Sequence, residues 1–176
     1  MKAMKKIRND ELEPEFIDWP VYMRRAIDLA GYAINTSSNP RVGCVLVTNQ
    51  KIVGEGWHVA MGEDHAEIMA LKQAGDRATS SIAFVTLEPC SHTGRTGPCS
   101  DALIQAGVSQ VVIASIDPNP EVAGSGVEKL VAAGIPVTQL TDFDSLARAV
   151  TPGYFKRREQ GIPYVRCKLA MSLDGR

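Results

Sequence analysis

Residues 82–107 read IAFVTLEPCSHTGRTGPCSDALIQAG, and this stretch carries the most information about the fold. The apolar run at 82–87 predicts a short buried strand, which Pro89 ends. Pro98 suits the first turn of a following helix, and Gly107 is placed to end that helix. A strand joined through a loop to a helix is the unit from which layered α/β domains are built.

The same alternation of strands and helices continues on both sides of this stretch. Before it, the pattern predicts a helix, a β-hairpin and a helix ended by Gly75, at residues 20–34, 42–57 and 65–74. After it, the pattern predicts a strand, a helix, a strand and a helix, at residues 111–114, 127–133, 135–137 and 144–150. We therefore predict an α/β fold with three layers, in which helices flank a central mixed sheet.

Length and composition are those of one globular domain of ordinary size. The chain has 176 residues, of which 44% are hydrophobic and 22% are charged. Its net charge of −1 gives no overall attraction to nucleic acid or to an anionic membrane. The apolar stretches are too short to span a bilayer, and no apolar segment follows Lys5 and Lys6 to form a secretory signal. We expect a cytoplasmic protein with no nucleic-acid or membrane partner.

One histidine and two cysteines form a candidate metal site: His65, Cys90 and Cys99. An imidazole and two thiolates give Zn²⁺ three protein ligands and leave the fourth tetrahedral position for water, whose pKa zinc lowers toward neutrality. Glu67 follows the histidine by two residues, at an offset that suits a proton carrier. This pattern is typical of zinc deaminases, although eight residues rather than two separate the cysteines here.

The same residues have other interpretations. His65, Cys90 and Cys99 could be a core histidine and two inert buried thiols. A structural zinc site is a further alternative, but it needs a fourth protein ligand, for which the chain offers Cys44, Cys167, His58 and His92. Cys44 and Cys167 lie in apolar, strand-like surroundings, so we expect both to be small buried side chains. Zinc bound by thiolates suits the reducing cytoplasm better than two disulfides would.

Five motifs, in order along the chain, give a more specific resemblance. They are NPRVG at 39–43, GEGWH at 54–58, HAE at 65–67, TLEPCSHTGRTGPC at 86–99, and DPNP at 117–120 followed by GSG at 124–126. Through these motifs the chain resembles the deaminase domain of the bifunctional riboflavin-biosynthesis deaminase/reductase, within the cytidine/deoxycytidylate deaminase-like superfamily. The resemblance implies a cytidine-deaminase-like fold. It also implies hydrolytic deamination of 2,5-diamino-6-ribosylamino-4(3H)-pyrimidinone 5′-phosphate to 5-amino-6-(5-phosphoribosylamino)uracil and ammonia.

The resemblance further implies roles for individual residues. One Zn²⁺ per chain would be bound by His65, Cys90 and Cys99, with Glu67 as the catalytic proton shuttle. Further residues would contact the substrate: Asn39, His58, Arg95, Thr96, Asp117 and Asn119. The chemistry is compatible, because a ribose phosphate needs a cation and hydroxyl or backbone donors. Alternatives stay open, since Arg95 could be solvated, His58 could be structural, and residues 117–120 could form only a turn.

The two ends of the chain are expected to lie outside the deaminase domain. Residues 1–19 are charged and patternless and predict an extension, so the domain would span 20–150. Residues 151–176 predict a linker and a stretch resembling the first strand of the family's reductase domain, which is truncated or absent. No glycine-rich dinucleotide motif occurs, so we expect neither reductase activity nor NADP binding. An unpaired strand edge would make a homo-oligomer a fair expectation.

Two other functions remain open. The chain could be another deaminase that acts on a nucleoside, a nucleotide or a tRNA base. Its near-neutral charge counts against tRNA, and the long segment between the cysteines counts against the short-loop nucleoside enzymes. It could also be a catalytically silent, zinc-stabilised binding domain, although such a domain has no need of Glu67.

Overall fold

A computed structural model describes residues 18–34, 36, 38–92, 97–120, 122–172 and 174–175. Within these residues a single mixed sheet has the strand order β2-β1-β3-β4-β5. The strands are β1 (Gly43–Thr48), β2 (Lys51–Trp57), β3 (Ile82–Leu87), β4 (Gln110–Ser115) and β5 (Val137–Gln139). Strand β1 is antiparallel to both of its neighbours, whereas β3, β4 and β5 run parallel to one another.

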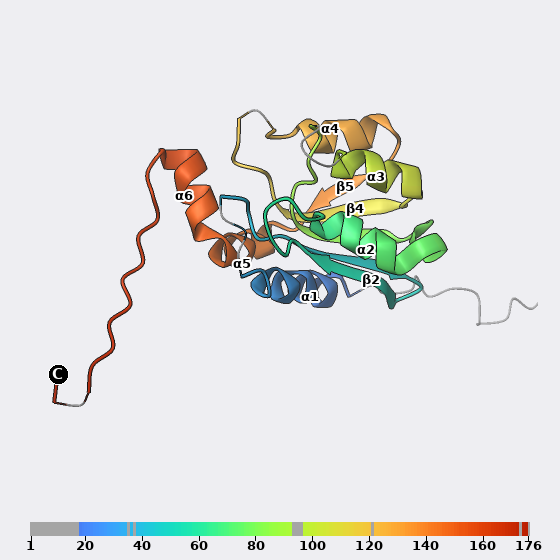
Figure 1. Ribbon diagram of the computed structural model, residues 1–176. Helices are drawn as coiled ribbons and strands as arrows, with labels where there is room; N and C mark the ends of the chain where they lie inside the picture. The colour runs from blue at the N-terminus through green and yellow to red at the C-terminus, as the bar shows by residue number, and fades with distance from the viewer. Residues whose placement is uncertain are drawn as a thin grey trace, which may run out of the picture.

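Helices cover both faces of this sheet (Figure 1). One face packs against α1 (Trp19–Gly31) and α5 (Asp144–Val150), and the other against α2 (Ala66–Ala74), α3 (Cys99–Ala106) and α4 (Ser125–Ala132). Because side chains alternate along a strand, neighbouring residues of β3 belong to different cores. Phe84 packs with α1 and α5, while Ala83 and Val85 pack with the other three helices. The structure therefore confirms the predicted three-layer α/β fold.

Two elements differ from the prediction. We predicted a strand at 135–137, but β5 begins at Val137, because Pro136 has no N–H group to donate to the sheet. We predicted no helix beyond residue 150, yet α6 (Pro152–Gln160) follows directly, with proline in its first turn and Gly161 in the left-handed conformation at its end. Residues 162–172 form neither helix nor strand.

Residues 1–17 of the extension predicted at 1–19 lie outside the described residues, whereas Asp18 caps α1 and Trp19 begins it. None of the helices in the described part of the chain has the length and apolarity that crossing a bilayer requires.

Helix α2 lies unusually close to β2, and glycines make this possible. A Cβ atom on Gly56 would lie 2.2 Å from the carbonyl oxygen of Ala66, and one on Gly54 would lie 2.2 Å from that of Ala70. The glycines of the strand and the alanines of the helix therefore let the two backbones approach directly. This contact holds the beginning of α2, and with it His65 and Glu67, against the sheet.

Candidate active site

Three ligand atoms from separate parts of the chain converge at the predicted metal site. His65 is the N-cap residue of α2, Cys90 follows β3, and Cys99 is the first residue of α3. The His65 Nδ1 atom and the two cysteine Sγ atoms all lie within 4.8 Å of one another. Nδ1 is 3.2 Å from the sulfur of Cys99 and 3.6 Å from that of Cys90. One imidazole nitrogen and two thiolates are a donor set that fits zinc.

A fourth protein ligand is not found in this group among the described residues. Of the alternatives raised by the sequence, Cys44 is buried within β1 and Cys167 is exposed. The expectation that Cys167 is buried was therefore wrong, because residues 162–172 do not join the sheet. Three ligands leave one tetrahedral position open, as in catalytic zinc sites rather than structural ones.

The surroundings of Cys90 favour its thiolate form. The Cys99 thiol and backbone N–H donate hydrogen bonds to its sulfur, and with His65 they hold the pKa of Cys90 well below its usual range. The same interaction, together with burial, raises the pKa of Cys99. The hydrogen bond to Cys90 also raises the pKa of His65. The three side chains are thus hydrogen-bonded to one another, and the protons in these bonds would be released when a metal binds.

Glu67 is almost completely buried beside these ligands, in the first turn of α2. Burial raises the pKa of its carboxyl group to about 7, and the negative charge of Cys90 adds to the increase. A carboxyl group with this pKa can both take up and release a proton near neutral pH.

A cavity of about 360 Å³ opens beside His65, Glu67 and Cys90, within the size range of small-molecule sites. Its wall includes the residues predicted to contact substrate that the structure describes, namely Asn39, His58, Asp117 and Asn119. The other two, Arg95 and Thr96, lie outside the described residues.

His58 and Asn39 are hydrogen-bonded to each other in the wall of this cavity. The backbone carbonyl of Asp64 can only accept, so the Nδ1 atom of His58 carries the proton at this 3.2 Å contact. The Nε2 atom then accepts from the Nδ2 amide of Asn39 at 3.3 Å. Burial lowers the pKa of His58, which agrees with a neutral ring. This arrangement fixes the orientation of the Asn39 amide.

Sequence reasoning missed Glu88, whose buried carboxylate organises the far side of the cavity. It accepts backbone N–H groups from the loop between β4 and α4, at Asp117 (3.2 Å) and Gly124 (3.0 Å), and from the first turn of α4, at Gly126 (2.9 Å) and Val127 (3.3 Å). Because Glu88 lies two residues before Cys90, it connects the metal site to this loop and to the beginning of α4. In the sequence, only its place directly before Pro89, within the motif at 86–99, could have pointed to Glu88.

Sequence reasoning also missed Tyr154 of α6. Its hydroxyl donates to the Asp117 carboxylate, with oxygen–oxygen distances of 2.8 and 3.0 Å. Asp117 in turn accepts the backbone N–H of Asn119 at 2.8 Å. Helix α6 therefore belongs to the wall of the cavity, and Arg158, one turn later, lines it as well.

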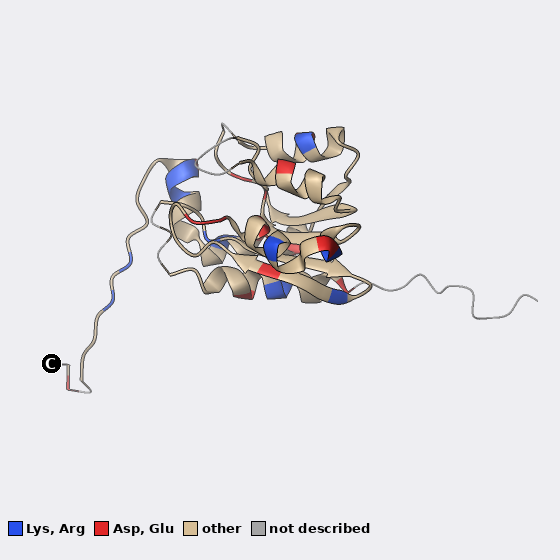
Figure 2. Ribbon diagram, turned by 45° about the vertical axis from the view of Figure 1, so that its right-hand side comes forward, with Lys and Arg blue, Asp and Glu red and all other residues tan. Residues whose placement is uncertain are grey.

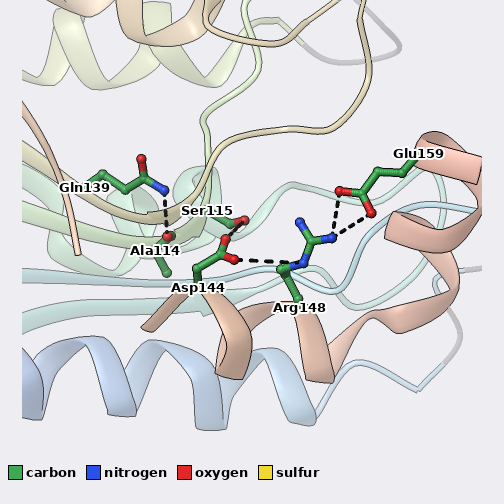
Figure 3. A network of polar contacts seen from close by, with 6 residues as sticks. All are labelled: Ala114, Ser115, Gln139, Asp144, Arg148 and Glu159. Atoms are coloured by element: carbon green, nitrogen blue, oxygen red, sulfur yellow. Dashed lines mark hydrogen bonds and ion pairs between the residues drawn. The ribbon is translucent and has the colours of Figure 1, made fainter. Parts of the chain in front are cut away.

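Helix α6 is attached to the sheet through α5 (Figure 3). Ser115, at the end of β4, donates to Asp144 at 2.5 Å, and Arg148 lies 3.9 Å from the same carboxylate. Arg148 also pairs with Glu159 of α6 at 2.6 Å and covers the ring of the buried Phe155. These contacts place the inner face of α6 against the cavity.

Comparison with known proteins agrees with this site. Residues 19–115 match the family described as "Cytidine and deoxycytidylate deaminase zinc-binding region". RibD of Haemophilus influenzae is 53% identical over 157 residues, which cover 89% of this chain and 42% of that protein. The diaminohydroxyphosphoribosylamino-pyrimidine deaminase of Buchnera aphidicola (subspecies Schizaphis graminum) is 51% identical over 143 residues, covering 81% of this chain and 97% of that protein.

Among solved structures, RibD of Acinetobacter baumannii superposes with a TM-score of 0.83 at 48% identity, covering 90% of this chain and 44% of that one. The chain thus spans less than half the length of the RibD relatives, but nearly the whole of the shorter deaminase. The matches include the candidate metal ligands and the fold that brings them together. The chain therefore belongs to the cytidine and deoxycytidylate deaminase family and, within it, to the diaminohydroxyphosphoribosylaminopyrimidine deaminases.

Proposed function

We propose that the chain removes the amino group of 2,5-diamino-6-ribosylamino-4(3H)-pyrimidinone 5′-phosphate by hydrolysis, giving 5-amino-6-(5-phosphoribosylamino)uracil and ammonia. The observation that carries the proposal is the cluster of His65, Cys90 and Cys99 donor atoms beside the buried Glu67, at a cavity of suitable size. The half-identical relative that the chain covers almost completely bears the name of this deaminase. The proposal concerns deamination and not NADP-dependent reduction.

In this proposal His65, Cys90 and Cys99 hold one zinc ion per chain, with Cys90 and Cys99 bound as thiolates. When bound, zinc lowers the pKa of a water molecule and makes it a nucleophile at neutral pH. Glu67 takes the proton that this water loses on attacking the amino-bearing ring carbon. It would pass that proton to the ring nitrogen, then take the proton of the new hydroxyl group on the ring carbon and give it to the amine, so that the carbon–nitrogen bond breaks, the carbonyl forms and ammonia leaves.

The remaining side chains of the cavity bind and orient the pyrimidine. The Asn39 amide, held by His58, and the side chains of Asp117 and Asn119 supply donors and acceptors for its ring substituents. Arg95 and Thr96 are proposed to contact the ribose phosphate. We further propose a cytoplasmic location, because the thiolates need a reducing environment. We propose no nucleic-acid or membrane partner, in line with the net charge of −1. We also propose that the chain forms a homo-oligomer, which light scattering can test.

The test is ammonia release by the purified zinc-loaded chain, with cytidine, deoxycytidylate and guanine as competing substrates. We expect release from the phosphoribosyl pyrimidine alone. Release from another base only would assign the chain to a different deaminase activity, whereas no release from a protein that binds zinc would favour a silent domain. The Glu67→Gln variant serves as the control for contaminating activity.

A further inference from the structure

The wall of the cavity is rich in carboxylates. Glu63, Glu67, Glu88 and Asp117 all contribute to it. Among the described residues of the wall, Arg158 is the only lysine or arginine. Within the part of the wall that the structure describes, Arg158 is therefore the one guanidinium or ammonium group that can attract an anionic group entering the cavity.

Arg158 is held at the cavity by α6. Its guanidinium carbon lies 5.7 Å from the centre of the Tyr154 ring, one turn earlier on the helix, and the Tyr154 hydroxyl is hydrogen-bonded to Asp117. The helix itself is attached through the Arg148–Glu159 ion pair (Figure 3) and through the buried Phe155. Packing thus fixes the helix that carries Arg158, while the Arg158 side chain itself is exposed to solvent.

Arg158 also has no ion-pair partner among the described residues. Its acidic neighbour Glu159 pairs with Arg148, and no described carboxylate lies within ion-pair distance of Arg158. Figure 2 shows the blue of lysine and arginine on α6, whereas the rest of the domain carries both blue and red. A guanidinium group presents a planar pair of N–H donors that suits the oxygens of a phosphate.

We propose that Arg158 binds the phosphate group of the substrate and so selects phosphorylated over unphosphorylated pyrimidines. The inference rests on the proposed function, because it concerns the far end of the same substrate. Arg158, which comes from α6, would act in addition to Arg95 and Thr96, which lie in the segment between the two cysteines. Tyr154 acts as a positioning residue, since it contacts both Arg158 and Asp117.

The experiment compares kcat/KM for the 5′-phosphate and for its dephosphorylated form. We expect Arg158→Gln to lower the preference for the phosphorylated substrate by about tenfold to a hundredfold, mainly through KM, as expected for a lost charge-assisted hydrogen bond. Arg158→Lys should recover part of it. Arg157→Gln is the matched control, because Arg157 is the adjacent basic residue of α6 and lines a neighbouring groove instead of this cavity.

An equal loss with both substrates would show a structural role and overturn the inference, as would an unchanged preference. A loss confined to the Arg157 variant would place the phosphate in the neighbouring groove and also overturn it. Calorimetric binding of ribose 5-phosphate provides a readout that needs no turnover. Suppose that the wild-type protein binds ribose 5-phosphate more tightly than Arg158→Gln does and yet deaminates none of the substrates. That result would support the anion site and count against the proposed function alone.

Discussion

The backbone N–H of Asp117 donates to the carboxylate of Glu88 at 3.2 Å, so a residue next to the metal ligands directly holds the loop on the far side of the cavity. The same carboxylate accepts the N–H of Gly126 at 2.9 Å, at the beginning of α4. Glu88 is only 4% exposed, so water cannot replace these bonds. The loop between β4 and α4 and the first turn of α4 are therefore tied to the end of β3 by one side chain.

We expect Glu88→Gln to destabilise the fold by about 2 to 4 kcal/mol, because an amide NH₂ group would face backbone donors in a buried site. Urea unfolding measures the change in the free energy of unfolding. Glu63→Gln is the control, since Glu63 lines the cavity but is exposed and should change stability little. Equal stability of the two variants would show that these bonds contribute nothing.

Glu67→Gln should keep zinc and the fold but lower kcat by about a hundredfold to ten-thousandfold, because glutamine cannot carry a proton. Zinc content by mass spectrometry and ammonia release are measured on the same sample. Full activity in this variant would refute the role of Glu67 as proton carrier.

The pKa of about 7 for Glu67, against an ordinary value of 4.5, predicts how the metal-free protein responds to pH. Between these values the folded state binds a proton that the unfolded state does not. The contribution of Glu67 to stability is therefore complete below pH 4.5 and is lost as the pH rises through 7. The loss is on the order of 3 kcal/mol.

Thermal and urea unfolding of the chelator-treated protein at pH 5 and pH 8 would test this. Relative to wild type, Glu67→Gln should be more stable at the higher pH, because a neutral amide avoids burying a charge. Glu63→Gln should keep the wild-type slope. Parallel pH profiles for wild type and Glu67→Gln would contradict the raised pKa.

Cys99→Ser should abolish stoichiometric zinc, because a serine hydroxyl is a poor replacement for a thiolate ligand. Elemental analysis should find about one zinc per wild-type chain and almost none in the variant. The matched control is Cys167→Ser, since Cys167 is exposed and far along the chain from the candidate ligands. Zinc retained in Cys99→Ser would remove Cys99 from the ligand set.

Gly126→Ala should destabilise the protein by about 2 kcal/mol or more, because its Cβ would lie 1.9 Å from the carbonyl oxygen of Pro89. The helix α4 would have to move away from Glu88 and the metal loop. Gly31→Ala, at the end of α1, meets no atom within 4 Å and should be neutral or stabilising. Urea unfolding of both variants separates steric conflict from a general effect of alanine.

The parts of the fold that could be predicted are those with strong local signals. The apolar run of β3 and the glycine that ends α3 place both elements correctly, since each depends on a few neighbouring residues. Helix α6 was missed because most of its side chains are polar, and Phe155 is its one buried residue. Tertiary packing on α5, which no local pattern encodes, stabilises this helix.

The candidate site divides in the same way. His65, Cys90 and Cys99 could be recognised by residue type and spacing, and the structure brings their donor atoms together. Glu88 and Tyr154 could not be recognised, because their partners are backbone groups and a carboxylate distant in the sequence. The chemical role of each site residue stays a prediction that the variants above test.

Two groups of residues that line the cavity come from different regions of the sequence. The three candidate ligands and Glu67 all precede residue 100, whereas Tyr154 and Arg158 come from a helix that follows the last strand. Under the role proposed for Arg158, substitutions in α6 would change which molecule is accepted without altering the reacting groups. In an evolving family, such a division would let substrate choice diverge quickly while the reaction stays the same.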